Sequence, residues 1–315
     1  MRIPVQILAS KTRSTVATLS LAVSLLWPLM MSARCLAEAV DAPDAKQSFG
    51  TFTNPEPVTI EGYSMDAMEP FISSDGQYLF FNNSNNLPTT NLYYAKRIND
   101  VTWMFQGEIG GVNTEGSLNA VPSMDMNEVF YFVSTRSYAT TYSTIYSGNF
   151  SNGNVSNIAI VPGISKDTPG DVNFDQCISP DGNTLYFDDG VFNVSGQLQQ
   201  ASIAIAQRSG NQFARLEDGA QIMKQINKGG WNYAPDISAS LLEFFFTRFD
   251  NTKSGALPTI YTATRSKISK PFGEPKKIEA ITGFAEAPAL SPDQKSLYYH
   301  LNVSGTFQIY RVTRP

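Results

Sequence analysis

The sequence from position 176 to 187 reads Gln176-Cys177-Ile178-Ser179-Pro180-Asp181-Gly182-Asn183-Thr184-Leu185-Tyr186-Phe187. A short apolar run, a polar turn and an aromatic run follow one another in this segment. Glycine tolerates positive φ and aspartate can bond to its own backbone, so Pro180-Asp181-Gly182 predicts a tight turn between two strands. Because large aromatic side chains suit a pleated, half-buried surface, the segment predicts a β-hairpin with one heavily buried strand.

The same plan occurs five times in the chain. The fourth residues of the opening runs are Ser73, Asp125, Ser179, Ser238 and Ser291, spaced by 52, 54, 59 and 53 residues. The aromatic strands are Tyr78-Leu79-Phe80-Phe81, Val129-Phe130-Tyr131-Phe132, Leu185-Tyr186-Phe187, Phe244-Phe245-Phe246 and Leu297-Tyr298-Tyr299. Third strands follow at 91–94, 144–146, 202–205, 259–261 and 308–310. Periods of this length indicate a repeat architecture.

A sheet of three or four strands cannot bury both of its faces alone, so consecutive sheets must pack side by side. The repeats therefore predict an all-β, five-bladed β-propeller of four-stranded antiparallel blades. It is expected to occupy residues 55–315 as one domain, with blades centred near 73, 125, 179, 238 and 291.

The fourth strand of each blade is expected upstream of an opening run. Candidates lie at 57–60, 106–109, 158–161, 213–222 and 277–279. The first of them precedes repeat one, while the chain ends just after the third strand of repeat five. The N-terminal strand is therefore expected to complete the last blade, which removes an exposed edge.

These repeats resemble a known family. The Ser179-Pro180-Asp181-Gly182 turn, the aromatic strand and Ile-Tyr strands such as Ile309-Tyr310 are similar to the WD40-like propeller repeat of TolB and many exported bacterial proteins. The resemblance covers nearly all of residues 55–315 and is weakest at 125–128, where Asp-Met-Asn-Glu replaces the turn. It implies a propeller fold and export. The sequence has no counterpart of the family's N-terminal α/β domain or sixth blade, so a Tol–Pal partnership is not implied.

Residues 1–39 have the order of a secretory signal peptide. Arg2, Lys11 and Arg13 precede an uncharged stretch at 14–33, and Ala37-Glu38-Ala39 fits a cleavage site. An uncleaved anchor is the alternative, because about 20 apolar residues can span a bilayer. With cleavage, residues 40–54 form an N-terminal extension, and the mature protein is expected in the periplasm or secreted, with no membrane span.

Removal of residues 1–39 leaves 19 basic and 27 acidic residues, a net charge of −8. Such a surface repels phosphate backbones, so nucleic acid is not an expected partner. Cys177 is then the only cysteine, and no intramolecular disulfide can form. Its apolar neighbours predict a buried, inert thiol.

The sequence excludes several kinds of active site. It holds one histidine, His300, and neither a G-x-S-x-G elbow nor a glycine-rich phosphate loop. His300 ends an aromatic strand and is expected to be a packed or surface residue. A histidine-rich or thiolate zinc site is excluded by count, and no cofactor is predicted.

Carboxylates remain as candidates. Residues that lead into the innermost strand of each blade converge at the mouth of a propeller's channel. The predicted ligand-binding residues of this kind are Asp66, Glu69, Asn119, Asp171, Asp175, Trp231, Asn232, Asp236 and Glu286. Trp231 could stack on a sugar ring or pack between blades. The acids could also be ordinary polar loop residues.

Three functions stay open from the sequence. The first is a non-catalytic exported monomer that binds an envelope or extracellular protein, peptide or glycan at the channel mouth. The second is a glycosidase-like enzyme with Asp175 or Glu286 as acid and Asp66 or Glu69 as nucleophile or base, since hydrolysis needs two carboxylates roughly 5–10 Å apart. The third is a structural ring in an envelope assembly. The same acids could instead hold Ca²⁺, which prefers oxygen ligands.

Overall fold

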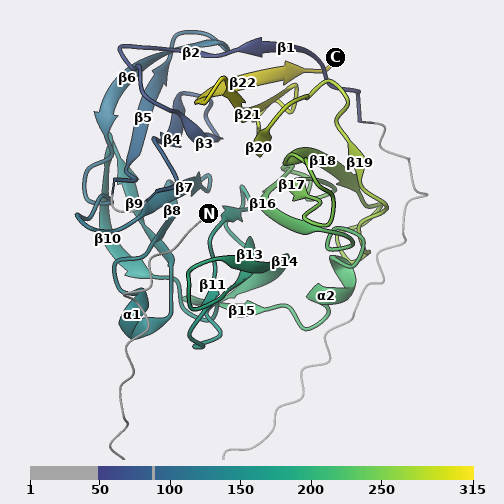
Figure 1. Cartoon of the computed structure of the whole chain (residues 1–315). Coiled ribbons are helices and arrows are strands. Elements are labelled where there is room, and N and C mark those ends of the chain that lie inside the picture. Colours follow the sequence, from purple (N-terminus) through teal and green to yellow (C-terminus); the bar gives the residue numbers. More distant parts are fainter. Residues whose placement is uncertain (1–48, 87–88) are drawn as a thin grey trace, which may run out of the picture.

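Five antiparallel sheets are arranged in a ring around a central channel in the computed structural model, which describes residues 49–86 and 89–315 (Figure 1). The predicted five-bladed all-β propeller is confirmed. From the channel outward, the strands of blades one and two are β3 (Met68–Ile72), β4 (Tyr78–Asn82), β5 (Leu92–Arg97), β6 (Thr102–Glu108), then β7 (Asn119–Met124), β8 (Val129–Ser134), β9 (Ile145–Ser151) and β10 (Asn154–Ile160).

The other three blades follow the same plan. Their strands are β11 (Asp171–Val172), β12 (Gln176–Ile178), β13 (Thr184–Phe192), β14 (Leu198–Ser209) and β15 (Gln212–Arg215); β16 (Trp231–Ile237), β17 (Glu243–Phe249), β18 (Thr259–Thr264) and β19 (Lys276–Lys277); and β20 (Ala285–Leu290), β21 (Ser296–Val303) and β22 (Thr306–Thr313). Blade three differs because its innermost strand is broken into β11 and β12, both paired with β13.

The N-terminal strand closes the ring as predicted, but a few residues earlier in the chain. β1 (Thr53–Pro57) pairs antiparallel with β22. The expected closing strand at 57–60 is instead divided, because β2 (Thr59–Glu61) runs parallel to β6 on blade one. Ile60 explains the switch: it is buried with Trp103 and Tyr298 in the core between blades one and five. The chain thus joins both blades at the seam.

The predicted fourth strands are confirmed in part. Strands β6 and β10 cover most of the segments predicted at 106–109 and 158–161. Strand β15 covers only 213–215 of the segment at 213–222, and β19 only residue 277 of the segment at 277–279, while the chain at 219–222 forms the short helix α2 (Gly219–Ile222). Ile222 and the adjacent Met223 enter the apolar core between blades three and four, which pulls the chain out of the sheet. The other helix in the described residues is α1 (Tyr138–Thr141), and no helix there is long and apolar enough to cross a membrane.

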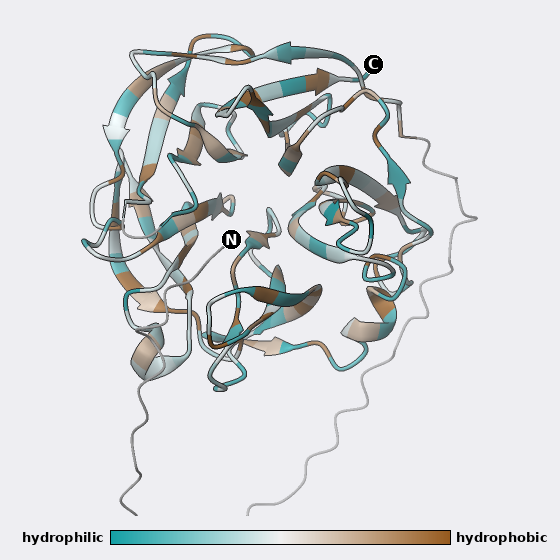
Figure 2. Ribbon diagram, in the orientation of Figure 1, coloured by the Kyte–Doolittle hydropathy of each residue, from teal (hydrophilic) through white to brown (hydrophobic). Residues whose placement is uncertain are grey.

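The aromatic second strands supply the cores between neighbouring blades. Phe80 packs edge-on against Phe130 at the junction of blades one and two, with ring centroids 5.2 Å apart. Tyr186 packs against Phe244 at 5.1 Å between blades three and four. Figure 2 shows the hydrophobic residues of these strands within the ring. Each buried aromatic removes on the order of 150–250 Å² from water, so the blades are stable only as neighbours.

Each of four innermost strands contains a bulge just before a proline. Glu69, Val121, Ala234 and Ala287 have φ values of 51°, 54°, 49° and 56°, and prolines follow all four. This left-handed backbone is unusual for residues other than glycine. Its stabilisation comes from the preceding blade.

The bulged N–H groups donate to the residue that follows the aromatic run on the second strand of the preceding blade. The bonds run from Val121 N to Asn82 Oδ1 (3.1 Å), Ala234 N to Asp188 Oδ2 (3.2 Å), Ala287 N to Thr247 Oγ1 (3.0 Å) and Glu69 N to His300 Nδ1 (3.1 Å). In blade two this position is Val133, which cannot accept a bond. In blade three, which follows blade two, the bulge position is Asp175. Its φ is not positive, and Gln176 follows it in place of a proline.

A buried ion pair joins blade five to blade four. Arg314 Nη1 and Nη2 each lie 2.8 Å from an oxygen of Glu243. The two side chains are 5% and 3% exposed. The guanidinium also lies over the ring of Phe52, 4.5 Å from its centroid. Removing one partner of such a pair leaves the other as a buried, uncompensated charge.

We therefore expect Glu243→Gln to lower the free energy of unfolding by about 3–5 kcal/mol, because Arg314 would lose its counter-charge. Urea denaturation followed by tryptophan fluorescence measures the change. Asp250→Asn is the matched control, since it breaks the surface pair with Lys253 and should leave the urea midpoint unchanged. Equal midpoints for both variants would contradict this account of the blade junction.

Candidate functional site

A cavity of about 480 Å³ lies at one mouth of the channel. Its carboxylates are Asp66 and Glu69 from blade one, Asp175 from blade three and Glu286 from blade five. Its aromatic side chains are Phe174, Trp231, Tyr233, Phe249, Phe284 and Phe307. The polar groups thus come from different blades, as the repeat alignment predicts.

Glu69 and Asp175 occupy corresponding positions in the repeat, immediately before the residues Pro70 and Gln176. Both lie where the innermost strand meets the channel, and both are buried at 7% and 5% exposure. Glu286 lies one position earlier in its own repeat, before the bulge at Ala287.

A chain of hydrogen bonds joins blades one, four and five beneath the cavity. His300 Nδ1 accepts from Glu69 N at 3.1 Å, so Nε2 carries the proton and donates to Glu286 Oε2 at 3.1 Å. Tyr233 donates its hydroxyl proton to the other oxygen, Oε1, of Glu286. Both oxygens of Glu286 thus have protein donors, and the only histidine of the chain is committed to structure and charge balance.

A second group holds two acids together in blade three. Asp175 Oδ2 and Asp188 Oδ2 accept from the same donor, Ala234 N, at 3.1 and 3.2 Å. Because both accept from one N–H group, the two carboxyl groups lie side by side, within reach of a hydrogen bond to each other. Since a carboxylate cannot donate, one of the two acids must hold a proton for this bond to exist.

Burial and like charge set the protonation of these groups. Burial raises the pKa of Asp175 well above its usual value, and the charge of Glu69 adds to the rise. Burial, and then the charge of Asp175, raise the pKa of Asp188 in the same way. Burial also raises the pKa of Glu69, although His300 opposes it. For His300 burial lowers the pKa, but the bond to Glu286 and the charge of Glu69 outweigh burial and raise it.

Two carboxylate oxygens in this region have no hydrogen-bond partner among the described residues. They are Oε2 of Glu69 and Oδ1 of Asp188. The other oxygen of Glu69 accepts from Asn85 at 3.0 Å. Buried polar atoms are nearly always paired, so the two orphaned oxygens indicate a place where a proton or a bound donor is missing.

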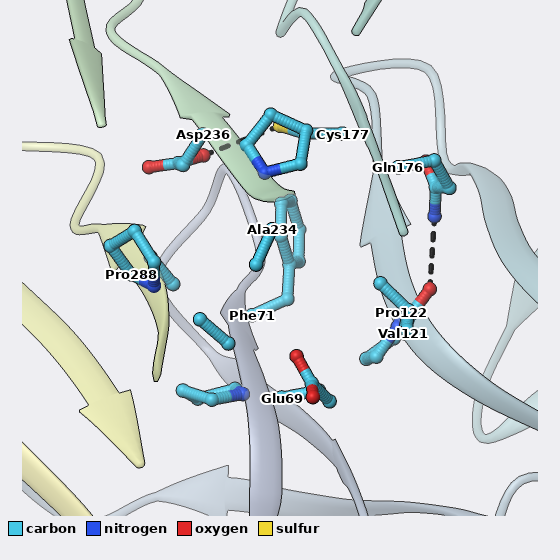
Figure 3. Close-up of a pocket in the computed structure, with 13 residues that line it drawn as sticks. Glu69, Phe71, Val121, Pro122, Gln176, Cys177, Ala234, Asp236 and Pro288 are labelled. Atoms are coloured by element: carbon cyan, nitrogen blue, oxygen red, sulfur yellow. Dashed lines mark hydrogen bonds between the residues drawn. The ribbon is translucent and has the colours of Figure 1, made fainter. Parts of the chain in front are cut away.

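Below the mouth the channel narrows to a space of about 20 Å³, lined by Glu69, Cys177 and Asp236 among others (Figure 3). Cys177 Sγ lies 3.3 Å from Asp236 Oδ1, and Gln176 Nε2 donates to Val121 O at 2.9 Å, as the dashed lines show. Burial raises the pKa of Asp236 to about 6. The predicted buried thiol is confirmed, and burial raises its pKa well above the usual value.

The structure brings together five of the nine predicted ligand-binding residues: Asp66, Glu69, Asp175, Trp231 and Glu286 line the mouth cavity. Asp236 lies deeper, where its Oδ2 accepts from Leu290 N of the next blade at 2.7 Å. Asp171 is outside the cavity at the broken strand of blade three, and its carbonyl accepts the hydroxyl proton of Tyr138.

Asn119 and Asn232 are also outside the mouth cavity, and the two have the same structural task. Asn119 donates to the turn carbonyls of Thr114 and Ser117, both at 3.2 Å. Asn232 donates to Gly230 O at 3.2 Å and accepts from Arg248 Nε at 2.7 Å. Both amides are fully buried. They tie down the loop before the innermost strand and have no free group for a ligand.

Three residues of the site were not predicted as part of it: Asp188, Tyr233 and His300. The sequence carries a signal for two of them. The residue after the aromatic run is polar in four repeats, as Asn82, Asp188, Thr247 and His300. A polar residue at the end of an otherwise buried strand needs a partner, and here the partner is the bulge of the next blade.

The Ca²⁺ site considered from the sequence stays a prediction. Within residues 49–86 and 89–315, no group of three or more His, Cys, Asp and Glu side chains is arranged to hold a metal ion.

No family model and no curated protein sequence matches the chain. Solved structures do match. A family 117 glycoside hydrolase, Zg3597, from Zobellia galactanivorans is 11% identical, with a TM-score of 0.54 over 84% of this chain and 90% of its own. The endo-arabinase from Bacteroides thetaiotaomicron is 16% identical, with a TM-score of 0.52 over 82% and 98%. At these identities the likeness shows the fold alone.

TolB from Acinetobacter baumannii also matches. It is 15% identical, with a TM-score of 0.45 over 79% of this chain. The match spans about half of the TolB chain, 54% of its length. What is common to these proteins is the β-propeller.

The buried acids make a pH dependence of stability predictable. Glu69, Asp175 and Asp188 have raised pKa values in the folded state, as has Asp236, from 3.8 to about 6. At a pH above the pKa values that these groups have in the unfolded chain, the folded protein binds more protons than the unfolded chain does. The free energy of unfolding therefore falls as the pH rises. The raised pKa of His300 acts in the same direction. Its contribution to the free energy of unfolding is full below pH 6.5 and is lost as the pH rises above that value. We expect maximal stability under mildly acidic conditions.

Asp188→Asn should raise the free energy of unfolding at neutral pH and flatten its decline with pH. The amide of Asn can accept from Ala234 N and donate to Asp175, so neither group has to be a protonated carboxylic acid. Its neighbour Asp189 is the control, because burial raises its pKa but Arg215 and Lys166 outweigh burial and lower it. Asp189→Asn should therefore destabilise at neutral pH. Urea denaturation across a pH series measures both, and an unchanged pH slope in Asp188→Asn would contradict the proton-sharing pair.

Proposed function

We propose that this protein is a non-catalytic β-propeller that binds a glycan in the cavity at the channel mouth. One observation carries the proposal: a cavity of about 480 Å³ is lined by six aromatic side chains and four carboxyl groups, of which Glu69 lies at the floor because it also lines the narrow space below. Ligand sites are typically concave and mostly apolar, with a few placed polar groups. A sugar ring matches this combination, since it has apolar C–H faces and hydroxyl groups at its edge.

Trp231 is the aromatic residue best placed to pack on a sugar. It is half-buried at the start of β16, and its indole Nε1 lies 3.3 Å from Gln199 O. Its ring lies 5.6 Å from that of Phe249. These contacts hold the ring in one orientation at the cavity wall, which lowers the entropy cost of stacking on a ligand.

The bonds of the acids favour binding over catalysis. Asp66 Oδ1 accepts from Phe307 N at 3.1 Å, and both oxygens of Glu286 have protein donors. Asp175 lies against Asp188 and accepts from Ala234 N, and burial raises its pKa. Each acid therefore holds the backbone or another side chain. The remaining lone pairs of these acids, and Oε2 of Glu69, which has no donor among the described residues, can accept sugar hydroxyls.

A glycosidase remains the second candidate, because one specific observation favours it. Asp175 has a raised pKa and lines the same cavity as Glu286, and paired carboxyl groups of different protonation are what glycoside hydrolysis uses. Two structures with the same fold are named as a glycoside hydrolase and an endo-arabinase. Fold alone does not carry an activity to this chain.

The location and wider role of the protein are part of the proposal. The sequence pattern at residues 1–39 lies outside the described residues, and with the TolB-like WD40 repeat it supports an exported protein of the periplasm or the cell exterior. The glycan could then be free or part of an envelope component. A purely structural ring in an envelope assembly would leave the mouth cavity without a ligand.

Trp231→Ala should weaken glycan binding at least about tenfold, or about 1.4 kcal/mol, while Trp231→Phe should keep most of it. A glycan array on the mature chain from residue 40 onward, followed by calorimetry on the best ligand, measures the effect. Met126→Ala is the control, because Met126 is 62% exposed and lines a separate cavity of about 140 Å³ at the other end of the channel. The proposal fails if no glycan binds, or if Trp231→Ala binds like the wild type.

Incubation of the array-positive glycan with the protein should release no new reducing ends. If reducing ends appear and Asp175→Asn abolishes them with binding intact, the glycosidase replaces the non-catalytic binder.

A further inference from the structure

The mouth cavity has a one-sided charge. Among the described residues that line it are four acids, Asp66, Glu69, Asp175 and Glu286, and no lysine, arginine or histidine. Among the described residues, the basic side chain that contacts these acids is His300, which is fully buried and bonds to Glu286. Each of the four acids is therefore either negatively charged or neutral through a bound proton, and no described side chain that lines the cavity is positively charged.

The floor also has an unfilled bonding position. Glu69 is 7% exposed, and its Oε2 has no partner in the described residues, whereas Oε1 is bound by Asn85 at 3.0 Å. Glu69 lines both the mouth cavity and the narrow section below it. An unpaired carboxylate oxygen in such a place is costly unless a donor reaches it. A ligand with a charged N–H donor at the floor would supply one.

The walls suit the same kind of group. Six aromatic side chains line the cavity, among them Trp231 and Tyr233. Aromatic faces attract cations through the ring quadrupole, and the attraction is larger when water is excluded. A cavity lined by both carboxyl groups and aromatic rings favours the binding of an ammonium group and disfavours the binding of an anion.

We propose that the ligand of this cavity is a glycan with a free, protonated amino group, in preference to a neutral or acidic glycan. This inference rests on the proposed function, because it specifies the chemistry of the same site. The sugar ring packs on the aromatic walls, and the ammonium group lies towards the carboxyl groups of Asp66 and Glu69.

Three tetrasaccharides with the same β-1,4-linked gluco backbone, together with one acidic tetrasaccharide, test the inference by calorimetry at mildly acidic pH. The chitosan tetramer has an ammonium group at C2, cellotetraose has a hydroxyl group there, and the chitin tetramer has a neutral acetamide; tetragalacturonate is the acidic probe. We expect the chitosan tetramer to bind at least about tenfold tighter than cellotetraose, with a preference that shrinks as salt is added. Tetragalacturonate should bind weakest.

Glu69→Gln and Asp66→Asn should each remove most of this preference, because each should weaken binding of the chitosan tetramer more than binding of cellotetraose. Both amides keep an oxygen that can accept the existing bonds from Asn85 and Phe307, and Asp66→Asn serves if Glu69→Gln does not fold. Asp171→Asn, outside the cavity, should behave like the wild type. Equal affinity for chitosan tetramer and cellotetraose, or tightest binding of tetragalacturonate, overturns the charge preference alone. If no tetrasaccharide and no arrayed glycan binds, the proposed function fails with it.

Discussion

The structure depends on one repeated contact, in which the N–H of a bulged residue in one blade is bound by a polar side chain of the preceding blade. Four of the five junctions have it, with Asn82, Asp188, Thr247 and His300 as acceptors. The contact holds an unfavourable left-handed backbone at a fixed position. It also sets the register between blades, which the apolar cores alone would specify only loosely.

The fifth junction shows that the contact and the bulge belong together. Val133 occupies the acceptor position in blade two, and blade three has neither the proline nor the positive φ that the other innermost strands share. The innermost strand there is broken into β11 and β12. Asp175 is consequently free to turn its side chain towards Asp188 and Ala234. An irregularity in the repeat thus brings a second acid to the channel mouth.

The candidate site consists largely of these junction residues. His300 and Asp188 are acceptors for bulges; His300 also bonds to Glu286, and the pKa of Asp188 is raised by burial and by the charge of Asp175. Stability and ligand chemistry therefore share the same atoms. The same bonds therefore hold the acids rigidly in a region of low dielectric constant.

The fold was predictable from the sequence because its signals are local and repeated. Turn residues such as Asp181-Gly182 and aromatic runs such as Phe244-Phe245-Phe246 act through short-range conformation and burial, and five copies reinforce one another. The convergence of Glu69, Asp175 and Glu286 also follows from the repeat alignment. Asn119 and Asn232 have the same sequence signal, yet their amides are used up by turn carbonyls, and position in the repeat cannot reveal this.

Only the tertiary structure decided the roles of His300 and Asp188 and the division of the closing strand at Val58. In each case the deciding partner is more than 40 residues away or on a different blade: Glu69 for His300, Ala234 for Asp188, and the Trp103–Tyr298 core for Ile60. A sequence pattern reports the preferences of neighbours along the chain. Hydrogen-bond satisfaction and charge balance depend instead on which distant groups the closed ring brings within reach.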